Sequence, residues 1–310
     1  MLRGHIATLA PFVRHAIAPA RAPSGPWTIT LHDADVGSVQ LTGLLREYPG
    51  ASSILLVVHG LGGSASSHYT VPPAVAAHAA KMSCLRLNLR GADLNGTDFY
   101  HAGLTEDLRA AIASLPPRYE RIYLLGYSMG GHVALRYAGE SPDPRVRAVA
   151  SVCAPLDLDR SATDFDRPVR AFYRRHVLSG LKAIYAAVGK RSPVRFPVQA
   201  AMRIGKIRSW DQSVVAPRFG FASAEDYYAR VSAVFALSSI ARPTLIVAAK
   251  ADPMVPEETL RPARRNCSSS VDWRWVDRGG HVGFPPDLDL GLPGGRGLER
   301  QIFDWFGRMT

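Results

Sequence analysis

Residues 126–131 read Gly-Tyr-Ser-Met-Gly-Gly and lie between the apolar run 122–125 and the helix-like segment 132–138. The pattern predicts a strand, a tight turn with Ser128 at its apex, and a helix. Glycine is expected on each side of the serine, because a Cβ at Gly126 or Gly130 would collide with neighbouring backbone. Such a turn lifts the Ser128 hydroxyl off the end of the sheet, toward the N-terminal amides of the new helix.

Apolar runs alternate with helical segments along much of the chain. The expected strands cover residues 27–31, 39–45, 53–58, 83–89, 122–125, 148–153, 243–249 and 271–276, and the expected helices include 73–81, 103–115, 171–188 and 298–308. The first two strands should form an antiparallel pair around the turn 33–38. Strands that alternate with helices predict an α/β fold with a mostly parallel central sheet flanked by helices.

Residues 155–240 interrupt this alternation. They are rich in aromatic residues and arginine and hold no run typical of a buried strand. We expect a helical cap here, inserted after the sixth strand. The first part of the core would then cover residues 1–154, including an N-terminal arm, and the remainder would cover residues 241–310. A cap can shape a substrate pocket and exclude water. Aromatic residues at helical spacing more often belong to a core than to a pocket. The candidates for the lining of an apolar acyl pocket are Phe172, Tyr173, Tyr185, Phe196, Trp210, Tyr227 and Phe235.

The composition, 47% hydrophobic and 20% charged residues, is typical of a globular protein with a sizeable core. The formal net charge is +11, but the basic residues are scattered, which indicates a solvated surface rather than a nucleic-acid-binding face. Cys84, Cys153 and Cys267 have no pairing or metal-binding spacing, so a reducing, cytoplasmic compartment fits. No apolar stretch approaches the length of about 18 residues that suggests a membrane-spanning helix.

The first 21 residues form a basic arm. Arginines are interspersed, and no acidic residue precedes Asp33. The apolar residues that recur at helical spacing are Leu2, Ile6, Leu9, Val13 and Ile17. This pattern fits a surface-seeking segment that makes peripheral membrane contact, or a transit-like segment. Because Pro11 and Pro19 disfavour a long helix, we expect an arm packed on the domain.

A serine nucleophile needs a general base. We select His281, because residues 279–284 follow the last strand and their glycines let a loop carry the imidazole close to Ser128. His59 is a rival, but it lies in the glycine-rich loop 59–64, where a structural hydrogen-bonding role is more typical. Three further histidines are candidates for the pocket: His68, His101 and His132.

The base needs an orienting acid, for which we select Asp252 after the strand 243–249. A solvated turn aspartate before proline is the alternative, and Asp157 and Asp277 are rival acids. The order Ser128, Asp252, His281 matches the Ser…Asp/Glu…His order of α/β-hydrolases.

The oxyanion that develops during acyl transfer needs fixed donors. We expect the backbone amides of Leu61 and Met129 to supply them, with Gly60 or Gly62 as alternative donors. The sequence holds no metal-binding motif, phosphate loop or dinucleotide fingerprint, and the expected chemistry needs no cofactor.

These stretches resemble the α/β-hydrolase superfamily and, more narrowly, its YheT-like (AB-hydrolase-4) esterase group. The wider resemblance rests on residues 59–63, 126–131, 280–281 and the Asp252 loop, and the narrower one on 88–91, 100–103, 224–228 and 279–284. It implies an α/β-hydrolase fold and an esterase-like serine hydrolase with the triad Ser128, Asp252 and His281. The stretch 208–212 departs from the more acidic and aromatic pattern of the group.

The sequence therefore predicts hydrolysis of carboxylic esters, with short- to medium-chain acyl or lipid-like substrates, through an acyl-enzyme on Ser128. Transfer of the acyl group to an alcohol or amine by the same triad is a second hypothesis. A hydrolase-like binding protein without catalysis is a third. No nucleic-acid partner is expected, and the oligomeric state is left open.

Overall fold

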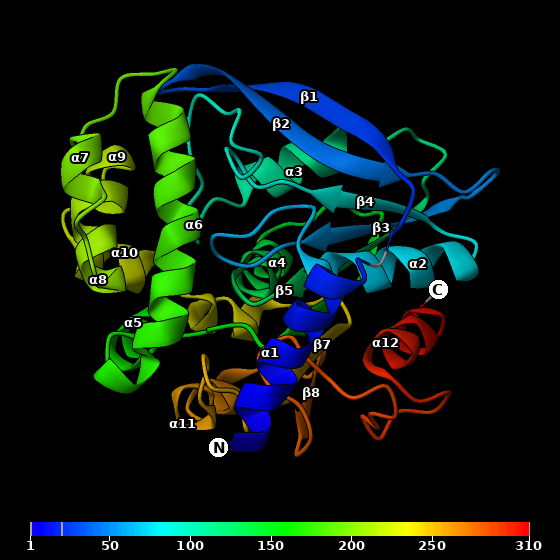
Figure 1. Ribbon diagram of the computed structural model, residues 1–310. Coiled ribbons are helices and arrows are strands. Elements are labelled where there is room, and N and C mark those ends of the chain that lie inside the picture. Colours follow the sequence, from blue (N-terminus) through cyan, green and yellow to red (C-terminus); the bar gives the residue numbers. More distant parts are fainter. Residues whose placement is uncertain (1, 20, 310) are drawn as a thin grey trace.

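The computed structural model describes residues 2–19 and 21–309, and its centre is an eight-stranded sheet (Figure 1). The strands are β1 (Gly25–Asp33), β2 (Gly37–Arg46), β3 (Ser53–Val58), β4 (Ser83–Leu87), β5 (Arg121–Tyr127), β6 (Val146–Val152), β7 (Thr244–Ala249) and β8 (Val271–Val276). Their order across the sheet is β1-β2-β4-β3-β5-β6-β7-β8. β2 pairs antiparallel with β1 and β4, and the other neighbours pair parallel. The predicted mostly parallel sheet is confirmed.

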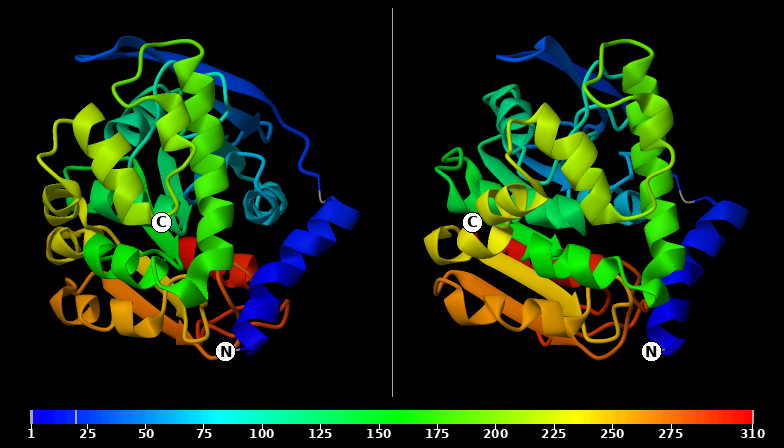
Figure 2. Two further views of the ribbon diagram at one scale, coloured as in Figure 1. Left: turned by 60° about the vertical axis from the view of Figure 1, so that its left-hand side comes forward. Right: turned by 90° about the vertical axis from the view of Figure 1, so that its left-hand side faces the viewer.

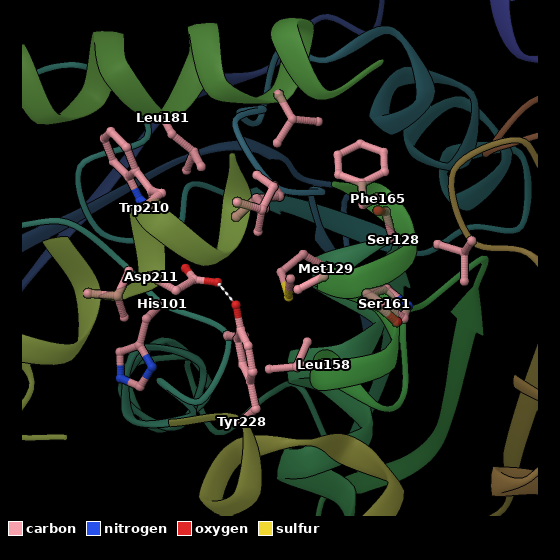
Figure 3. A pocket seen from close by; sticks show the side chains of 18 of the residues that line it. His101, Ser128, Met129, Leu158, Ser161, Phe165, Leu181, Trp210, Asp211 and Tyr228 are labelled. Carbon is pink, nitrogen blue, oxygen red and sulfur yellow. Dashed lines mark hydrogen bonds between the residues drawn. The ribbon is translucent and has the colours of Figure 1, made fainter. Parts of the chain in front are cut away.

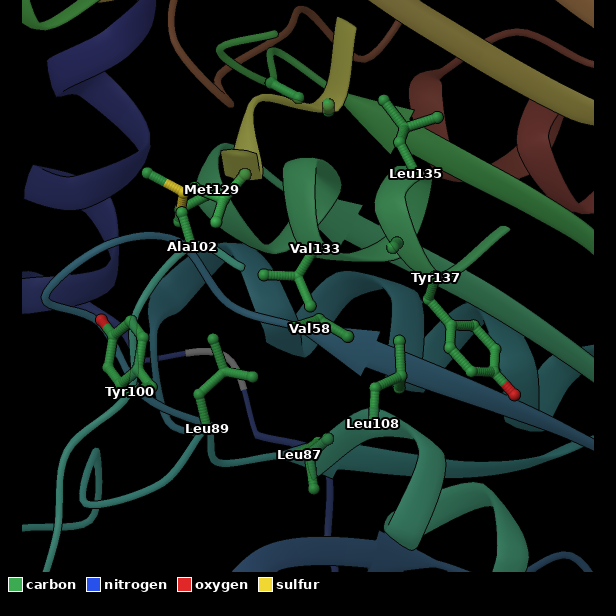
Figure 4. Close-up of a cluster of buried hydrophobic side chains, with 14 of the residues drawn as sticks. Val58, Leu87, Leu89, Tyr100, Ala102, Leu108, Met129, Val133, Leu135 and Tyr137 are labelled. Carbon is green, nitrogen blue, oxygen red and sulfur yellow. The ribbon is translucent and has the colours of Figure 1, made fainter. Parts of the chain in front are cut away.

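Helices cover both faces of this sheet. α2 (Val71–Ala79) and α12 (Leu298–Phe306) pack on one face, and α3 (Glu106–Ala113) and α4 (Met129–Gly139) pack on the other. β3 therefore contributes alternate side chains to two cores, and its nearly continuous apolar run reflects burial on both faces. Figure 4 shows Val133 of α4 in one buried cluster with Val58 of β3 and Leu108 of α3.

Between β6 and β7 the described chain forms helices and no strand. The α-helices are α5 (Leu158–Phe165), α6 (Ala171–Gly189), α7 (Val198–Ala201), α8 (Ile207–Trp210), α9 (Ala216–Arg218) and α10 (Ala224–Val231). All of them except α9 contribute buried side chains to the core cluster of α3 and α4, and in Figures 1 and 2 the six helices lie together beside the sheet. These helices occupy the expected cap segment; its status as a separate domain stays a prediction. After β7, the short helix α11 (Glu257–Leu260) precedes β8.

The N-terminal arm contains α1 (Leu2–Ile17), a helix of 16 residues with Pro11 inside it. Pro11 was expected to disfavour a long helix, but α1 continues through it. Pro11 has no N–H that could donate to the Ala7 carbonyl. That carbonyl instead lies against the loop at Gly283, where a Cβ on Gly283 would be 2.0 Å from the Ala7 carbonyl oxygen. Tertiary packing thus overrides the local preference. Among residues 2–19 and 21–309, no helix has the length and apolar character needed to cross a membrane.

Candidate active site

Ser128 lies at the turn between β5 and α4, in a strained backbone conformation with φ 53° and ψ −122°. Its amide donates to the Val152 carbonyl at 2.8 Å, which ties the turn to β6. The flanking glycines are required by close approach. A Cβ at Gly126 would lie 2.3 Å from the Gly130 carbonyl oxygen, and a Cβ at Gly130 would lie 2.2 Å from that of Val58. The turn therefore has no room for a side chain at either glycine.

The structure brings Ser128, His281 and Asp252 together. The Ser128 hydroxyl oxygen lies 2.9 Å from His281 Nε2, and His281 Nδ1 lies 2.9 Å from Asp252 Oδ2. The other carboxylate oxygen of Asp252 accepts from the amides of Met254 and Val255 at 2.8 and 2.9 Å, which fixes the carboxylate. His281 and Asp252 are both buried. This arrangement can deprotonate a serine and stabilise the resulting imidazolium.

Helix α1 holds the loop that carries His281. The His281 amide donates to the Thr8 hydroxyl oxygen at 2.8 Å, and that hydroxyl donates to the Gly4 carbonyl at 2.8 Å. Thr8 could not be predicted from the sequence, because no pattern links a threonine in a terminal arm to a loop more than 270 residues away.

Leu61 and Met129, the residues expected to supply the oxyanion donors, line the same pocket as Ser128. Among the described residues, neither amide has a hydrogen-bond acceptor within reach. The two alternative donors are engaged: the Gly60 amide donates to the Tyr69 hydroxyl at 3.0 Å and the Gly62 amide to the Tyr100 hydroxyl at 2.7 Å. The engaged amides fix the loop and leave the Leu61 amide available.

The rival residues have structural partners of their own. His59 accepts from the Leu89 amide at 3.1 Å through Nε2, so its Nδ1 donates to the Gly60 carbonyl at 2.8 Å. Burial lowers the pKa of His59 to about 4, so this imidazole stays neutral. Asp157 caps α5 and accepts from the Arg160 amide, and Asp277 forms an exposed ion pair.

The three other candidate histidines have different surroundings. His132 is buried, with Nδ1 and Nε2 each within 2.8 Å of a backbone carbonyl oxygen. His68 lies against Phe12 of α1, outside the pocket. His101 lines the pocket and packs on Phe219, and burial lowers its pKa to about 3. His101 is therefore an uncharged wall residue.

An apolar pocket extends from Ser128 beneath the helices that follow β6 (Figure 3). It encloses about 780 Å³ including its open mouth. Apolar side chains supply most of the lining, among them Leu158, Phe165, Val177, Leu181, Ile207, Trp210, Val215 and Met254. Of the seven aromatic candidates, Trp210 and Tyr227 line it, Phe172 and Phe235 are exposed, and the other three lie outside the lining.

A polar pair interrupts this apolar lining. The Tyr228 hydroxyl donates to Asp211 Oδ2 at 2.6 Å, and both side chains line the pocket (Figure 3). Asp211 begins a π-helical turn, Asp211–Val215, a feature often found at functional sites. Burial raises the pKa of Asp211 to about 7, against the opposing hydrogen bond from Tyr228. Sequence patterns could not identify this pair, because its members lie on two different elements, the π-helical turn and α10, 17 residues apart.

The raised pKa of Asp211 predicts a pH dependence of stability. An unfolded aspartate has a pKa of about 3.9, so between about pH 4 and pH 7 the folded chain binds more protons at this site. Its contribution to the free energy of unfolding therefore falls as pH rises through this window. Asp211→Asn removes the titration and should be more stable, relative to the wild type, at about pH 8 than at about pH 4. Urea unfolding at both pH values measures this, and parallel pH profiles would contradict it.

A metal ion has poor ligands at this site. In the part of the chain that the structure describes, the ligand atoms that cluster within 4.8 Å belong to Cys153, Asp252 and His281. Asp252 and His281 already hydrogen-bond to each other. Burial raises the pKa of the Cys153 thiol well above its usual value, which disfavours the thiolate that a metal binds.

The sheet order, the serine turn and the loops at the ends of β7 and β8 define an α/β-hydrolase. The family described as alpha/beta hydrolase fold matches residues 53–287, and the chain belongs to this family. Over 259 residues it is 32% identical to the Escherichia coli (strain K12) protein "Putative esterase YheT", covering 81% of this chain and 75% of that one. Within the family it is thus YheT-like.

Two further comparisons extend this likeness. The chain is 33% identical to the Synechocystis protein "Putative esterase slr0264" over 179 residues, which cover 51% of this chain and 48% of that protein. The solved structure of Est1E from Butyrivibrio proteoclasticus superposes with a TM-score of 0.55 and 14% identity, covering 91% of this chain and 98% of that one. At this identity the second likeness concerns the fold alone.

Proposed function

We propose that the protein is a serine hydrolase of carboxylic esters. His281 takes the Ser128 proton while the hydroxyl oxygen attacks the acyl carbon, and Asp252 stabilises the imidazolium. The amides of Leu61 and Met129 hold the oxyanion. His281 then protonates the leaving alcohol, and water attacks the acyl-enzyme by the same route to release the acid.

The continuous contact from Asp252 through His281 to Ser128 carries this proposal, since each heavy-atom distance is 2.9 Å. Such distances suit general-base catalysis. The free amides beside Ser128 add the second requirement, electrostatic stabilisation of the transition state. The printed names of two relatives, "Putative esterase YheT" and "Putative esterase slr0264", agree with the chemistry.

The apolar pocket indicates an acyl chain as its occupant. Each buried methylene is worth about 0.8 kcal/mol, so kcat/KM for p-nitrophenyl esters should rise roughly two- to fourfold per added CH₂ until the pocket is full. A series from acetate to dodecanoate measures this. A flat or falling profile from the shortest ester would contradict an acyl role for the pocket.

A pocket variant sharpens this test. Leu181 of α6 lies on the side of the pocket away from Ser128 (Figure 3). Leu181→Phe should therefore shorten the preferred chain while hydrolysis of the acetate ester, which does not reach that far, stays unchanged. Product analysis in the presence of a competing alcohol separates hydrolysis from acyl transfer, because only transfer yields a new ester.

A further inference from the structure

Helix α1 turns its apolar side away from the protein. Its inward side carries Gly4, Thr8 and Pro11. Opposite them, at helical spacing, lies a stripe of large apolar residues that are 36 to 80% exposed: Leu2, Ile6, Leu9, Val13 and Ile17. A surface helix of a globular protein ordinarily turns such a stripe toward the core. The stripe of α1 has no partner among the described residues.

The inward side of α1 is fixed by close backbone contact. A Cβ at Gly280 would lie 2.2 Å from the Gly4 carbonyl oxygen. Gly283 approaches Ala7 as closely, and Thr8 accepts from the His281 amide. The helix could not roll its large side chains inward without breaking these contacts. Its outward apolar stripe is therefore a consequence of how α1 packs on the catalytic loop.

The exposed apolar surface continues onto the start of α6. Tyr173 stacks on His5 of α1 with ring centroids 5.6 Å apart, and its hydroxyl lies 2.7 Å from His5 Nδ1. The neighbouring Phe172 is 64% exposed, and Val169, just before α6, is 65% exposed. Figure 2 shows α1 on the outside of the molecule beside α6. We call the stripe of α1 with Val169 and Phe172 the docking face.

Basic side chains border the docking face. Arg3 and Arg14 on α1 and Arg175 on α6 are exposed, and no acidic residue precedes Asp33 in the sequence. A second copy of the same face would bring these like charges together. Phosphate groups at a lipid surface would instead pair with them. Charge therefore favours an anionic lipid surface over self-association as the occupant.

We propose that the docking face binds the surface of an anionic lipid bilayer, with its apolar side chains at the boundary between headgroups and acyl chains. α1 contacts the His281 loop, and α6 lines the pocket with Val177 and Leu181. Docking would thus bring the candidate active site to a source of water-insoluble esters. Binding itself does not depend on Ser128.

The experiment is co-sedimentation with vesicles of phosphatidylcholine, alone and mixed with phosphatidylglycerol. The test variant is Ile6→Glu/Val13→Glu/Ile17→Glu. The control, Val36→Glu/Leu94→Glu/Phe235→Glu, also replaces three exposed apolar residues and changes the net charge equally. Wild type and control should bind the mixed vesicles more tightly than phosphatidylcholine alone. The test variant should lose binding by roughly a hundredfold, because three anchors would no longer enter the apolar boundary.

Two independent readouts keep the outcomes distinct. Turnover of a soluble p-nitrophenyl ester should be unchanged in both triple variants, which shows that they are folded, and Ser128→Ala should still bind vesicles. Equal vesicle binding by wild type and test variant, or no binding by wild type, would overturn the proposal. Light scattering that finds a wild-type dimer and a monomeric test variant would overturn it in favour of a second copy. Absence of ester turnover would count against the proposed hydrolase alone.

Discussion

Ser128→Ala is expected to lower kcat for p-nitrophenyl ester hydrolysis by roughly 10⁴- to 10⁶-fold. The variant loses the hydroxyl oxygen that lies 2.9 Å from His281 Nε2, so no acyl-enzyme can form at this position. The remaining rate should come from substrate binding and the oxyanion donors. Steady-state kinetics with a soluble ester measures the loss.

The same pocket supplies a matched control. Ser161 also lines the pocket, and its hydroxyl oxygen is buried without a hydrogen-bond partner among the described residues. Ser161→Ala removes the same atom from the same cavity and should change kcat less than about tenfold. Substantial turnover by Ser128→Ala, or an equal loss in Ser161→Ala, would reject Ser128 as the nucleophile.

Arg90→Ala is expected to lower the free energy of unfolding by about 3–5 kcal/mol. Arg90 is only 1% exposed and pairs with Asp107 at 2.7 Å, Asp98 at 2.9 Å and Asp33 at 2.6 Å. Arg218 of α9 binds Asp98 as well, at 2.8 Å, so the cluster ties the helices after β6 to the sheet. Without Arg90, the buried carboxylates would lose the guanidinium that balances their negative charge.

Urea unfolding followed by circular dichroism measures the loss of stability expected in Arg90→Ala. Burial raises the pKa of Asp107, and Arg90 opposes that rise, so in Arg90→Ala this carboxyl should take up a proton more readily. Arg261→Ala, which breaks an exposed pair with Glu257, is the control and should have a far smaller effect. A similar, small loss of stability in both variants would show that the Arg90 cluster does not anchor the fold.

Much of the fold could be predicted from local sequence patterns. β3 and β7 are apolar on both faces, so their sequences alone indicate strands covered on both sides. The glycine-flanked turn 126–131 indicated Ser128. Loop position and chain order indicated Asp252 and His281, because parallel strands end at one edge of a sheet.

Features that depend on tertiary contact could not be predicted. Pro11 disfavours a helix locally, and only packing on the Gly283 loop explains why α1 continues through it. The Asp211–Tyr228 pair and the support of His281 by Thr8 join residues whose own segments carry no sign of each other. The sequence offered seven aromatic residues of the cap segment as pocket candidates. Only the arrangement of the helices separates Trp210, which lines the pocket, from the exposed Phe172.

A serine nucleophile activated by His281 should react with a fluorophosphonate probe, and intact mass measurement with peptide mapping locates the adduct. One adduct per chain is expected on Ser128. The adduct should be absent in Ser128→Ala and should form much more slowly in His281→Ala. An unmodified wild-type protein, or an adduct on another residue, would show that Ser128 is not the activated nucleophile.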